Sequence, residues 1–263
     1  MKKYLLLTLI AIYIGIIIPC KAYSVDISVG TTIWALWMER KYESGSGGPT
    51  MTQRDRHDQT FLYGPAMSAQ FNDNFNLTFI YLYGQFDGTA SFNGKVKRTD
   101  SDLALNYRLN DYFKAFGGLK YMAFSESALD SSGINDRYNA KHKGYGPGLG
   151  LSATLPVTEN VYILTTLSGF YLWGKESGNA SPSTPPPTIP FKQNYNEYGI
   201  NTTISIAYYI TPASTTISLG KRFQYFRTKY DGDVPRGGFN GDLNSMKNKF
   251  YGTTLTATYS FSI

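Results

Sequence analysis

The sequence predicts an all-β chain folded as an antiparallel transmembrane β-barrel of about ten strands. Apolar residues recur at every second position over stretches of about ten residues, and aromatic residues bracket these stretches. A strand that crosses a membrane needs this pattern, because its outer face contacts lipid and its inner face does not. Tyr and Trp are enriched where such a strand meets the polar boundary.

The aromatic residues expected to form this boundary girdle are Trp37, Tyr63, Tyr83, Tyr145, Tyr171, Trp173, Tyr198, Tyr251 and Phe261.

Ten segments alternate well enough to be predicted as strands. They are residues 25–39, 58–71, 74–86, 96–109, 112–125, 144–157, 161–173, 195–210, 214–228 and 248–263. A soluble two-sheet sandwich alternates in the same way, but its strands usually have about 5–6 residues. The segments here have 13 or more, a length suited to a tilted strand that crosses a bilayer.

The connections between these segments are of two kinds that alternate strictly. Four are tight and rich in turn-forming residues, at 72–74, 110–111, 158–160 and 211–213. Five are longer and polar, near 41–57, 87–95, 126–143, 174–194 and 229–247. This asymmetry predicts short periplasmic turns and long extracellular loops. Nine connections give ten strands, and eight remain possible if one weak strand pair merges.

The N-terminal residues 1–22 are predicted to be a cleaved signal peptide, which leaves 23–263 as a single barrel domain. Lys2 and Lys3 precede an apolar segment at 5–18, and Ala22 suits cleavage, with Ser24 as an alternative site. Fourteen apolar residues fall short of the ~20 that a spanning helix needs. Pro19 directly before Cys20 disfavours a lipoprotein, and cleavage would leave no cysteine for disulfide chemistry.

Composition excludes several functional classes. The chain has 22 Tyr, 16 Phe and 26 Gly with 17% charged residues, which is unusual for a soluble enzyme. A mean hydropathy of −0.27 excludes a bundle of membrane helices. Removal of the predicted signal peptide lowers the net charge from +6 to +3, with 22 basic and 19 acidic residues. This charge is too small and too scattered to indicate nucleic acid as a partner.

The C-terminal segment alternates up to its last residue, through Tyr251, Leu255, Tyr259, Phe261 and Ile263. With this segment, the chain resembles the small integral β-barrel proteins of the bacterial outer membrane over essentially all of 23–263. The resemblance implies the cell outer membrane of a Gram-negative bacterium, with outer-membrane lipid, lipopolysaccharide and the barrel-assembly machinery as partners. Those barrels typically end in an aromatic residue, whereas Ile263 is last here. The resemblance implies no activity.

Two features depart from the pattern. Pro65 and Pro147 lie inside predicted strands, and each follows a Tyr-Gly pair, so we expect a β-bulge at each. Lys221 falls on the outward face between Leu219 and Phe223. Either it extends to the interface, or a bulge switches the register there.

The inward face carries a set of charged residues: Arg98, Asp100, Asp102, Arg108, Lys114, Lys120, Glu197 and Arg222. The turn at 110–111 predicts that Asp100 or Asp102 lies beside Lys120. The set has two interpretations, a salt-bridge network that fills a narrow lumen, or a charged constriction that selects ions. We favour the first, because about eight strands are already filled by side chains and water-filled porins use 16–18.

A second inward-facing group consists of Gly144, Gly146, Gly148 and Gly150. No Lys-Ser/Thr pair follows, so a phosphate-binding loop is not indicated. We expect these glycines to make room for bulky neighbours, with Phe116, Lys120 and Tyr162 as candidates.

The two histidines, His57 and His142, are predicted to lie in or beside long loops. Ten-stranded outer-membrane proteases use a His–Asp pair and an Asp pair at the extracellular mouth, and the nearest carboxylates here are Asp58 and Asp100. No family motif accompanies either histidine. We therefore expect no enzyme activity, no metal site and no cofactor.

The segment 177–190 is rich in proline and is predicted to be an exposed outer loop. The favoured function is a structural or narrow-pore barrel whose charged lumen is largely plugged. The alternatives are a passive porin for small solutes or ions, and an adhesin or receptor that binds an extracellular ligand through its loops. A protease or lipid-modifying enzyme is the remote alternative.

Overall fold

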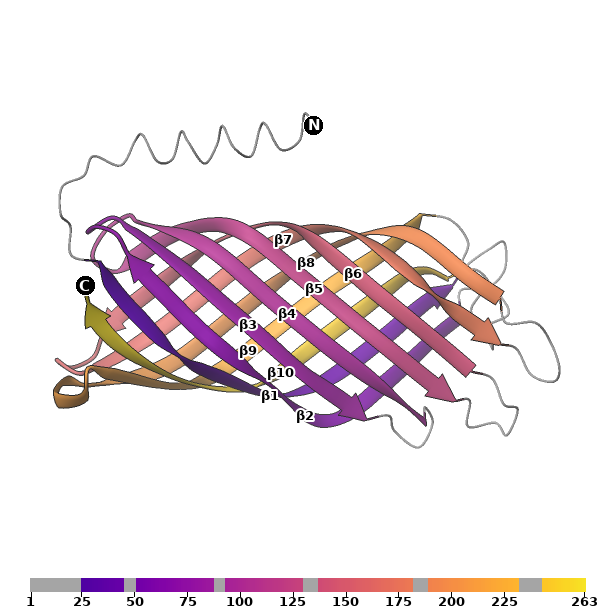
Figure 1. Ribbon diagram of the computed structural model, residues 1–263, viewed down its shortest axis with the longest axis horizontal. Helices are drawn as coiled ribbons and strands as arrows, with labels where there is room; N and C mark the ends of the chain where they lie inside the picture. The colour runs from indigo at the N-terminus through magenta and orange to yellow at the C-terminus, as the bar shows by residue number, and fades with distance from the viewer. Residues whose placement is uncertain (1–24, 45–50, 88–92, 130–136, 182–188, 232–242) are drawn as a thin grey trace, which may run out of the picture.

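The structure is a computed structural model that describes residues 25–44, 51–87, 93–129, 137–181, 189–231 and 243–263. Each strand pairs antiparallel with its neighbour in the chain, and the first pairs with the last to close a barrel (Figure 1). The strands are β1 (Asp26–Ser44), β2 (Met51–Gln70), β3 (Phe75–Asp87), β4 (Asn93–Arg108), β5 (Phe113–Leu129), β6 (Arg137–Pro156), β7 (Val161–Ser181), β8 (Ile189–Ile210), β9 (Thr215–Asp231) and β10 (Leu243–Ser262). The predicted ten-stranded barrel is confirmed. The predicted signal peptide, 1–22, lies outside the described residues.

The described part of the chain contains no helix long and apolar enough to cross a membrane.

In three of the four short turns, a side-chain oxygen accepts hydrogen bonds from backbone N–H groups. Asn72 Oδ1 accepts from the N–H groups of Asn74 and Phe75, each at 2.9 Å, and Asn110 does the same in the next turn. Such turns fix the register of the strands they join. Figure 1 shows them at the same end of the barrel as the start of β1 and the end of β10.

The outward face of the barrel carries the aromatic girdle. Trp37 stacks on Tyr251, its partner across β1 and β10, with ring centroids 5.8 Å apart. Three further pairs face each other across neighbouring strands: Tyr63 with Tyr83, Tyr145 with Trp173, and Tyr171 with Tyr198. Phe261 stacks on Tyr259 at the short-turn end. Between these two levels exposed Leu and Ile residues dominate, which is the surface of a barrel in the bacterial outer membrane.

The strands continue well beyond the girdle, so they include residues that the sequence predicts to be in long loops. β7 runs to Ser181 and β8 begins at Ile189, which places much of 177–190 in the sheet. Pro190 belongs to the sheet through its pairing with Asn179 of β7, and β8 pairs with β9 only from Asn194 onward. The prediction was wrong because the alternation inverts beyond the girdle, as expected for a barrel wall surrounded by water. Apolar residues there face inward, namely Tyr42, Ala140, Phe191, Tyr195, Tyr230 and Met246.

The two predicted bulges at proline are also wrong. Pairing of β2 with β3 stops after Tyr63 and resumes at Ala66 in the same register, and β6 and β7 behave in the same way around Pro147. Each proline therefore interrupts the ladder on one side without adding a residue. The register of β9 continues unbroken through Lys221, which excludes the bulge alternative there. Lys221 remains outward and donates to Thr253 Oγ1 at 2.7 Å.

An ion-pair cluster ties three of the strand extensions together. Glu43 of β1 accepts from Lys247 Nζ of β10 at 2.5 Å and from Arg227 Nη2 of β9 at 3.2 Å. Ser245 Oγ donates to the same carboxylate at 3.0 Å. The hydrogen bond from Lys247 is the main reason that the pKa of Glu43 falls to about 2, outside the membrane-crossing part of β1.

We predict that Glu43 contributes stability that acid removes. Because its pKa is lowered on folding, this contribution is fully present above pH 4.5 and is lost as the pH falls through about 2. The free energies of unfolding of refolded wild type and Glu43→Gln, measured with urea, should differ by about 1 kcal/mol near neutral pH and converge in acid. The exposed Asp58→Asn variant is the control, and a difference that stays constant with pH would contradict the prediction.

Candidate functional site in the barrel interior

The centre of the interior is an ion-pair network around Asp100. Its carboxylate lies 2.8 Å from Arg98 Nη2, 2.8 Å from Lys120 Nζ and 3.7 Å from Arg222 Nη2. Lys120 also binds Asp102, at 2.9 Å, so both carboxylates considered from the sequence contact it. β4, β5 and β9 position these groups, because each presents every second residue to the interior. Three cations therefore surround one buried carboxylate.

A cluster of apolar side chains lies next to this network, on the side of the long loops. Phe124 of β5 and Phe250 of β10 have ring centroids 6.2 Å apart, and Phe226 of β9 contacts both. Because β5 and β10 are five strands apart in either direction around the barrel, these rings come from opposite walls. The whole cluster is Trp34, Leu36, Met38, Leu62, Leu82, Phe86, Val96, Met122, Phe124, Phe170, Leu172, Phe226 and Phe250.

Arginine side chains join the network to the apolar cluster. The Arg98 guanidinium lies 4.0 Å from the ring centroid of Phe250, and that of Arg222 lies 4.4 Å from Trp34. Arg98 Nη2 also donates to Gln224 of β9, across the lumen from β4. The aromatic faces stabilise guanidinium groups that have lost most of their water.

A second polar layer lies further toward the long loops. Arg40 of β1 pairs with Glu126 of β5, and its Nε donates to Asn248 Oδ1 of β10 at 2.8 Å. His142 lies between two buried carboxylates, with Nδ1 3.5 Å from Glu176 and Nε2 3.3 Å from Glu197. These contacts connect β6, β7 and β8 inside the barrel.

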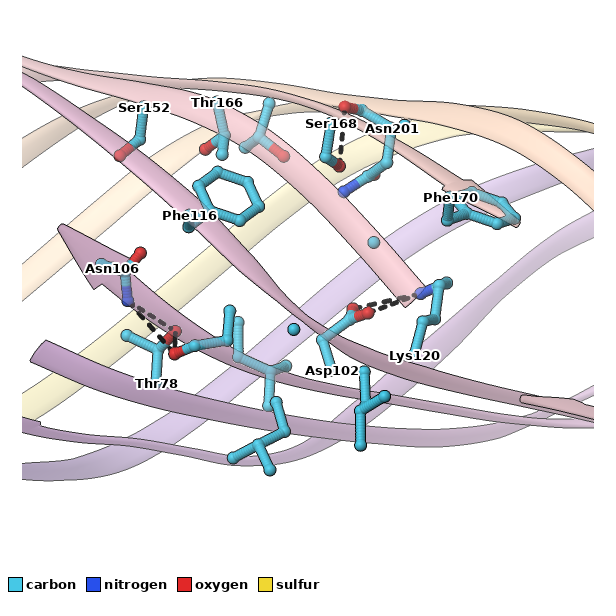
Figure 2. A pocket seen from close by; sticks show the side chains of 18 of the residues that line it. Thr78, Asp102, Asn106, Phe116, Lys120, Ser152, Thr166, Ser168, Phe170 and Asn201 are labelled. Carbon is cyan, nitrogen blue, oxygen red and sulfur yellow. Dashed lines mark hydrogen bonds and ion pairs between the residues drawn. The ribbon is translucent and has the colours of Figure 1, made fainter. Parts of the chain in front are cut away.

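A cavity of about 300 Å³ occupies the interior on the short-turn side of the network. Figure 2 shows Asp102 and Lys120 joined on one side of it, with Ser152, Thr166 and Asn201 around its wall. Asp102 retains 35% of its side chain exposed, so this part of the cavity has room for water-sized groups. A second cavity of about 170 Å³ shares Asn106 with the first and reaches the turn residues Asn72, Asp73, Asn74 and Asp111.

The remaining charged candidates lie apart from the central network. Arg108 is 40% exposed at the short-turn end and pairs with Asp111 at 2.6 Å. Lys114 lines the same short-turn cavity. Glu197 belongs to the layer of His142 and also accepts from Thr228 Oγ1 at 2.7 Å. The structure therefore divides the inward charges into three levels.

Two of the four inward glycines predicted on β6, Gly144 and Gly150, leave room for an aromatic side chain, whereas a Cβ at Gly146 would meet the backbone of Tyr171 and Leu172. A Cβ at Gly150 would lie 2.6 Å from Phe116, one of the neighbours expected from the sequence. A Cβ at Gly144 or Gly174 would instead meet Tyr195, at 2.8 Å and 2.0 Å. Tyr195 was not identified from the sequence, although it occupies an inward position of β8.

The prediction that the two histidines lie in or beside long loops is wrong, because both lie within strands. His57 is in β2 and His142 is in β6, and both are at least 95% buried. Apolar alternation does not mark this part of β6 as a strand because polar side chains, those of Asn139, Lys141 and Lys143, face outward there. Of the two carboxylates considered as partners, Asp58 is exposed and Asp100 is engaged in the central network. Within the described residues, no group of three His, Cys, Asp or Glu side chains could hold a metal ion.

Sequence reasoning missed the aromatic part of the interior. Phe226 and Phe250 occupy inward positions of β9 and β10, in phase with the charged residue Arg222 and with Asn248. An inward aromatic residue on a strand that is otherwise polar inside was the available signal. It indicates that opposite walls approach closely enough to exclude water at that level.

Comparison with known proteins identifies the fold and no closer relationship. No protein-family model matches the chain, and no curated protein sequence matches it. Among solved structures, the outer membrane protease OmpT from Escherichia coli is similar with a TM-score of 0.61 and 12% identity, covering 90% of this chain and 97% of OmpT. At that identity the likeness shows a shared fold alone.

Two weaker matches have TM-scores below 0.5 and support no further conclusion. The outer membrane protein AlkL matches with a TM-score of 0.45 and 11% identity, covering 94% of this chain and 96% of AlkL. The toluene transporter TodX of P. putida matches with a TM-score of 0.37 and 12% identity, covering 92% and 91%.

We predict that Asp100→Asn destabilises the barrel by about 3–5 kcal/mol, because it leaves three buried cations without their shared anion. Asp102→Asn is the matched control on the same strand. Its partly exposed carboxylate should cost about 1 kcal/mol or less when neutralised. Urea unfolding followed by heat-modified gel mobility measures both variants. Equal losses for the two would show that Asp100 does not organise the network.

Proposed function

We propose that this protein is a structural outer-membrane barrel whose lumen is closed to solutes near mid-height. The observation that carries the proposal is the contact of Phe124 with Phe250 from opposite walls. Next to these rings, Arg222 and Asp100 also approach from opposite sides, at 3.7 Å. Packed rings and paired charges at neighbouring heights leave an ion without a hydrated path.

The cavity on the short-turn side then becomes a pocket open to the periplasm and closed above. Ser, Thr and Asn side chains lie in its lining beside the apolar Ile80, Phe116 and Phe170, and these polar groups suit water or a small polar solute. The exposure of Asp102 and the adjoining cavity among the turns support access from that side. In this proposal the protein holds such a pocket without passing its contents across the membrane.

The second candidate is passive transport of small anions. Arg98, Lys120 and Arg222 outnumber Asp100 and Asp102 at the level where the cavity ends, which favours anions. This function would require the rings of Phe124, Phe226 and Phe250 to separate. A third candidate, an adhesin or receptor that acts through the long loops, involves segments outside the described residues.

Proteolysis and lipid modification are not part of the proposal. His142 is 4% exposed, its ring lies 3.8 Å from that of Tyr195, and both its nitrogens face carboxylates. A general base must reach the proton it removes, directly or through one water molecule. His142 is enclosed by its own partners and offers no such approach.

Planar-bilayer recording tests the closed lumen directly. We expect refolded wild type to show no discrete conductance steps, because packed rings expel water. Phe124→Ala with Phe250→Ala should introduce steps, whereas the outward-facing Leu149→Ala should not. Wild-type steps whose ion selectivity changes with Lys120→Gln or Asp102→Asn would overturn the proposal in favour of transport.

Assays of hydrolysis test the absence of catalysis. We expect the protein refolded in detergent with added lipopolysaccharide to cleave neither peptides nor lipids above the rate of a heat-denatured sample. Turnover that disappears in His142→Ala or His57→Ala would show that the buried histidines become accessible and would contradict this part of the proposal.

A further inference from the structure

One charged side chain stands out on the membrane-facing surface. Among the described outward residues that lie between the two aromatic levels, Lys221 is the one that carries a charge. The next outward residues along β9 are Leu219 and Phe223, and the residue paired with Lys221 on β8 is Ile204. Ionisable residues in such positions are expensive and need a partner. Thr253 is an uncharged acceptor, so its hydrogen bond with Lys221 does not neutralise the positive charge of the lysine.

Lys221 borders a groove on the outside of β8, β9, β10 and β1. The groove has a volume of about 410 Å³ and is lined mainly by apolar atoms of Trp37, Ile204, Phe223 and Tyr251. Small residues also line it, Thr202 on β8 and Gly252 on β10, and the small side chains of Thr253 and Ala35 follow Lys221 across the sheet. The aromatic residues project above these small ones and enclose the groove at girdle height.

Further cations lie directly above the groove, beyond the girdle. They are Lys41, Arg227, Lys229, Lys247 and Lys249, on β1, β9 and β10. Lys249 lies 5.1 Å from the ring centroid of Tyr251, which joins this group to the groove. The outward acids of the same extensions are Glu39, Glu43 and Asp231, so positive charge is in excess. The girdle marks the level of the lipid headgroups.

We propose that this groove binds a phosphorylated glycolipid of the outer leaflet. An acyl chain would lie in the apolar groove, and a phosphate at girdle height would be bound by Lys221 from below and Lys249 from above. The long side chain of Lys221 lets its ammonium group rise toward the interface while its methylenes remain in lipid. Two lysines on opposite sides of one aromatic layer complement a phosphate that lies within that layer.

The test uses full-length mature protein refolded in detergent, with bisphosphorylated lipid A as the probe and native mass spectrometry as the readout. We expect retention of this lipid to exceed that of the same lipid without phosphates. Lys221→Met and Lys249→Gln should each lower retention by about fivefold, as expected for loss of one charge near the surface. Lys143→Gln is the matched control, since Lys143 lies beyond the girdle on β6, four strands from β10.

Several results would overturn the proposal. Equal retention of the phosphorylated and dephosphorylated lipids would remove the phosphate from it. An equal loss in Lys143→Gln and Lys221→Met would show diffuse attraction around the whole rim. Displacement of the lipid by inorganic phosphate alone would show that the acyl chain does not contribute to binding. Heat-modified mobility confirms that each variant is folded, and Lys221→Met should fold readily because it replaces a lipid-facing charge by an apolar side chain.

Discussion

The narrow interior of a ten-stranded barrel is the constraint on which the rest of the structure depends. Barrels of about eight strands are just filled by their own side chains, and two more strands add little width. Phe124 and Phe250 therefore meet from opposite walls, as do Arg222 and Asp100. Groups forced into contact must match, so aromatic rings pack together and every central carboxylate acquires a cation.

Inward residues change in size and polarity with height, and this change determines what each level can do. Near the short turns they are small or polar, as at Gly148, Ser152 and Asn201, and a cavity remains. At mid-height they are large or paired, and the walls touch. The outward face changes in the opposite sense, from an apolar band to a cationic rim, with Lys221 as the exception that links the two.

Local patterns account for the parts of the fold that the sequence predicts well. Period-two alternation and the turns at Asn72 and Asn110 are encoded within a few residues, so strand number and chain direction follow from them. The strand ends were missed because alternation inverts beyond the girdle. Asp102 and Lys120 could be paired in advance because one short turn joins their strands.

The contacts across the lumen could not be predicted in this way. Arg98 and Gln224 are 126 residues apart and belong to opposite walls. Which inward residues meet depends on barrel closure and strand tilt, and no local pattern contains either quantity. The same holds for Tyr195, which lies against two glycines on neighbouring strands.

The proposed function requires an interior that is open from the short-turn side and closed above it. Labelling a Ser152→Cys variant with a charged, membrane-impermeant thiol reagent tests this claim most directly. Ser152 lines the cavity, and the predicted mature chain contains no other cysteine. We predict protection in intact cells and rapid labelling once the reagent is admitted to the periplasm. Equal labelling in both conditions would show that the lumen is open from outside and would contradict the account.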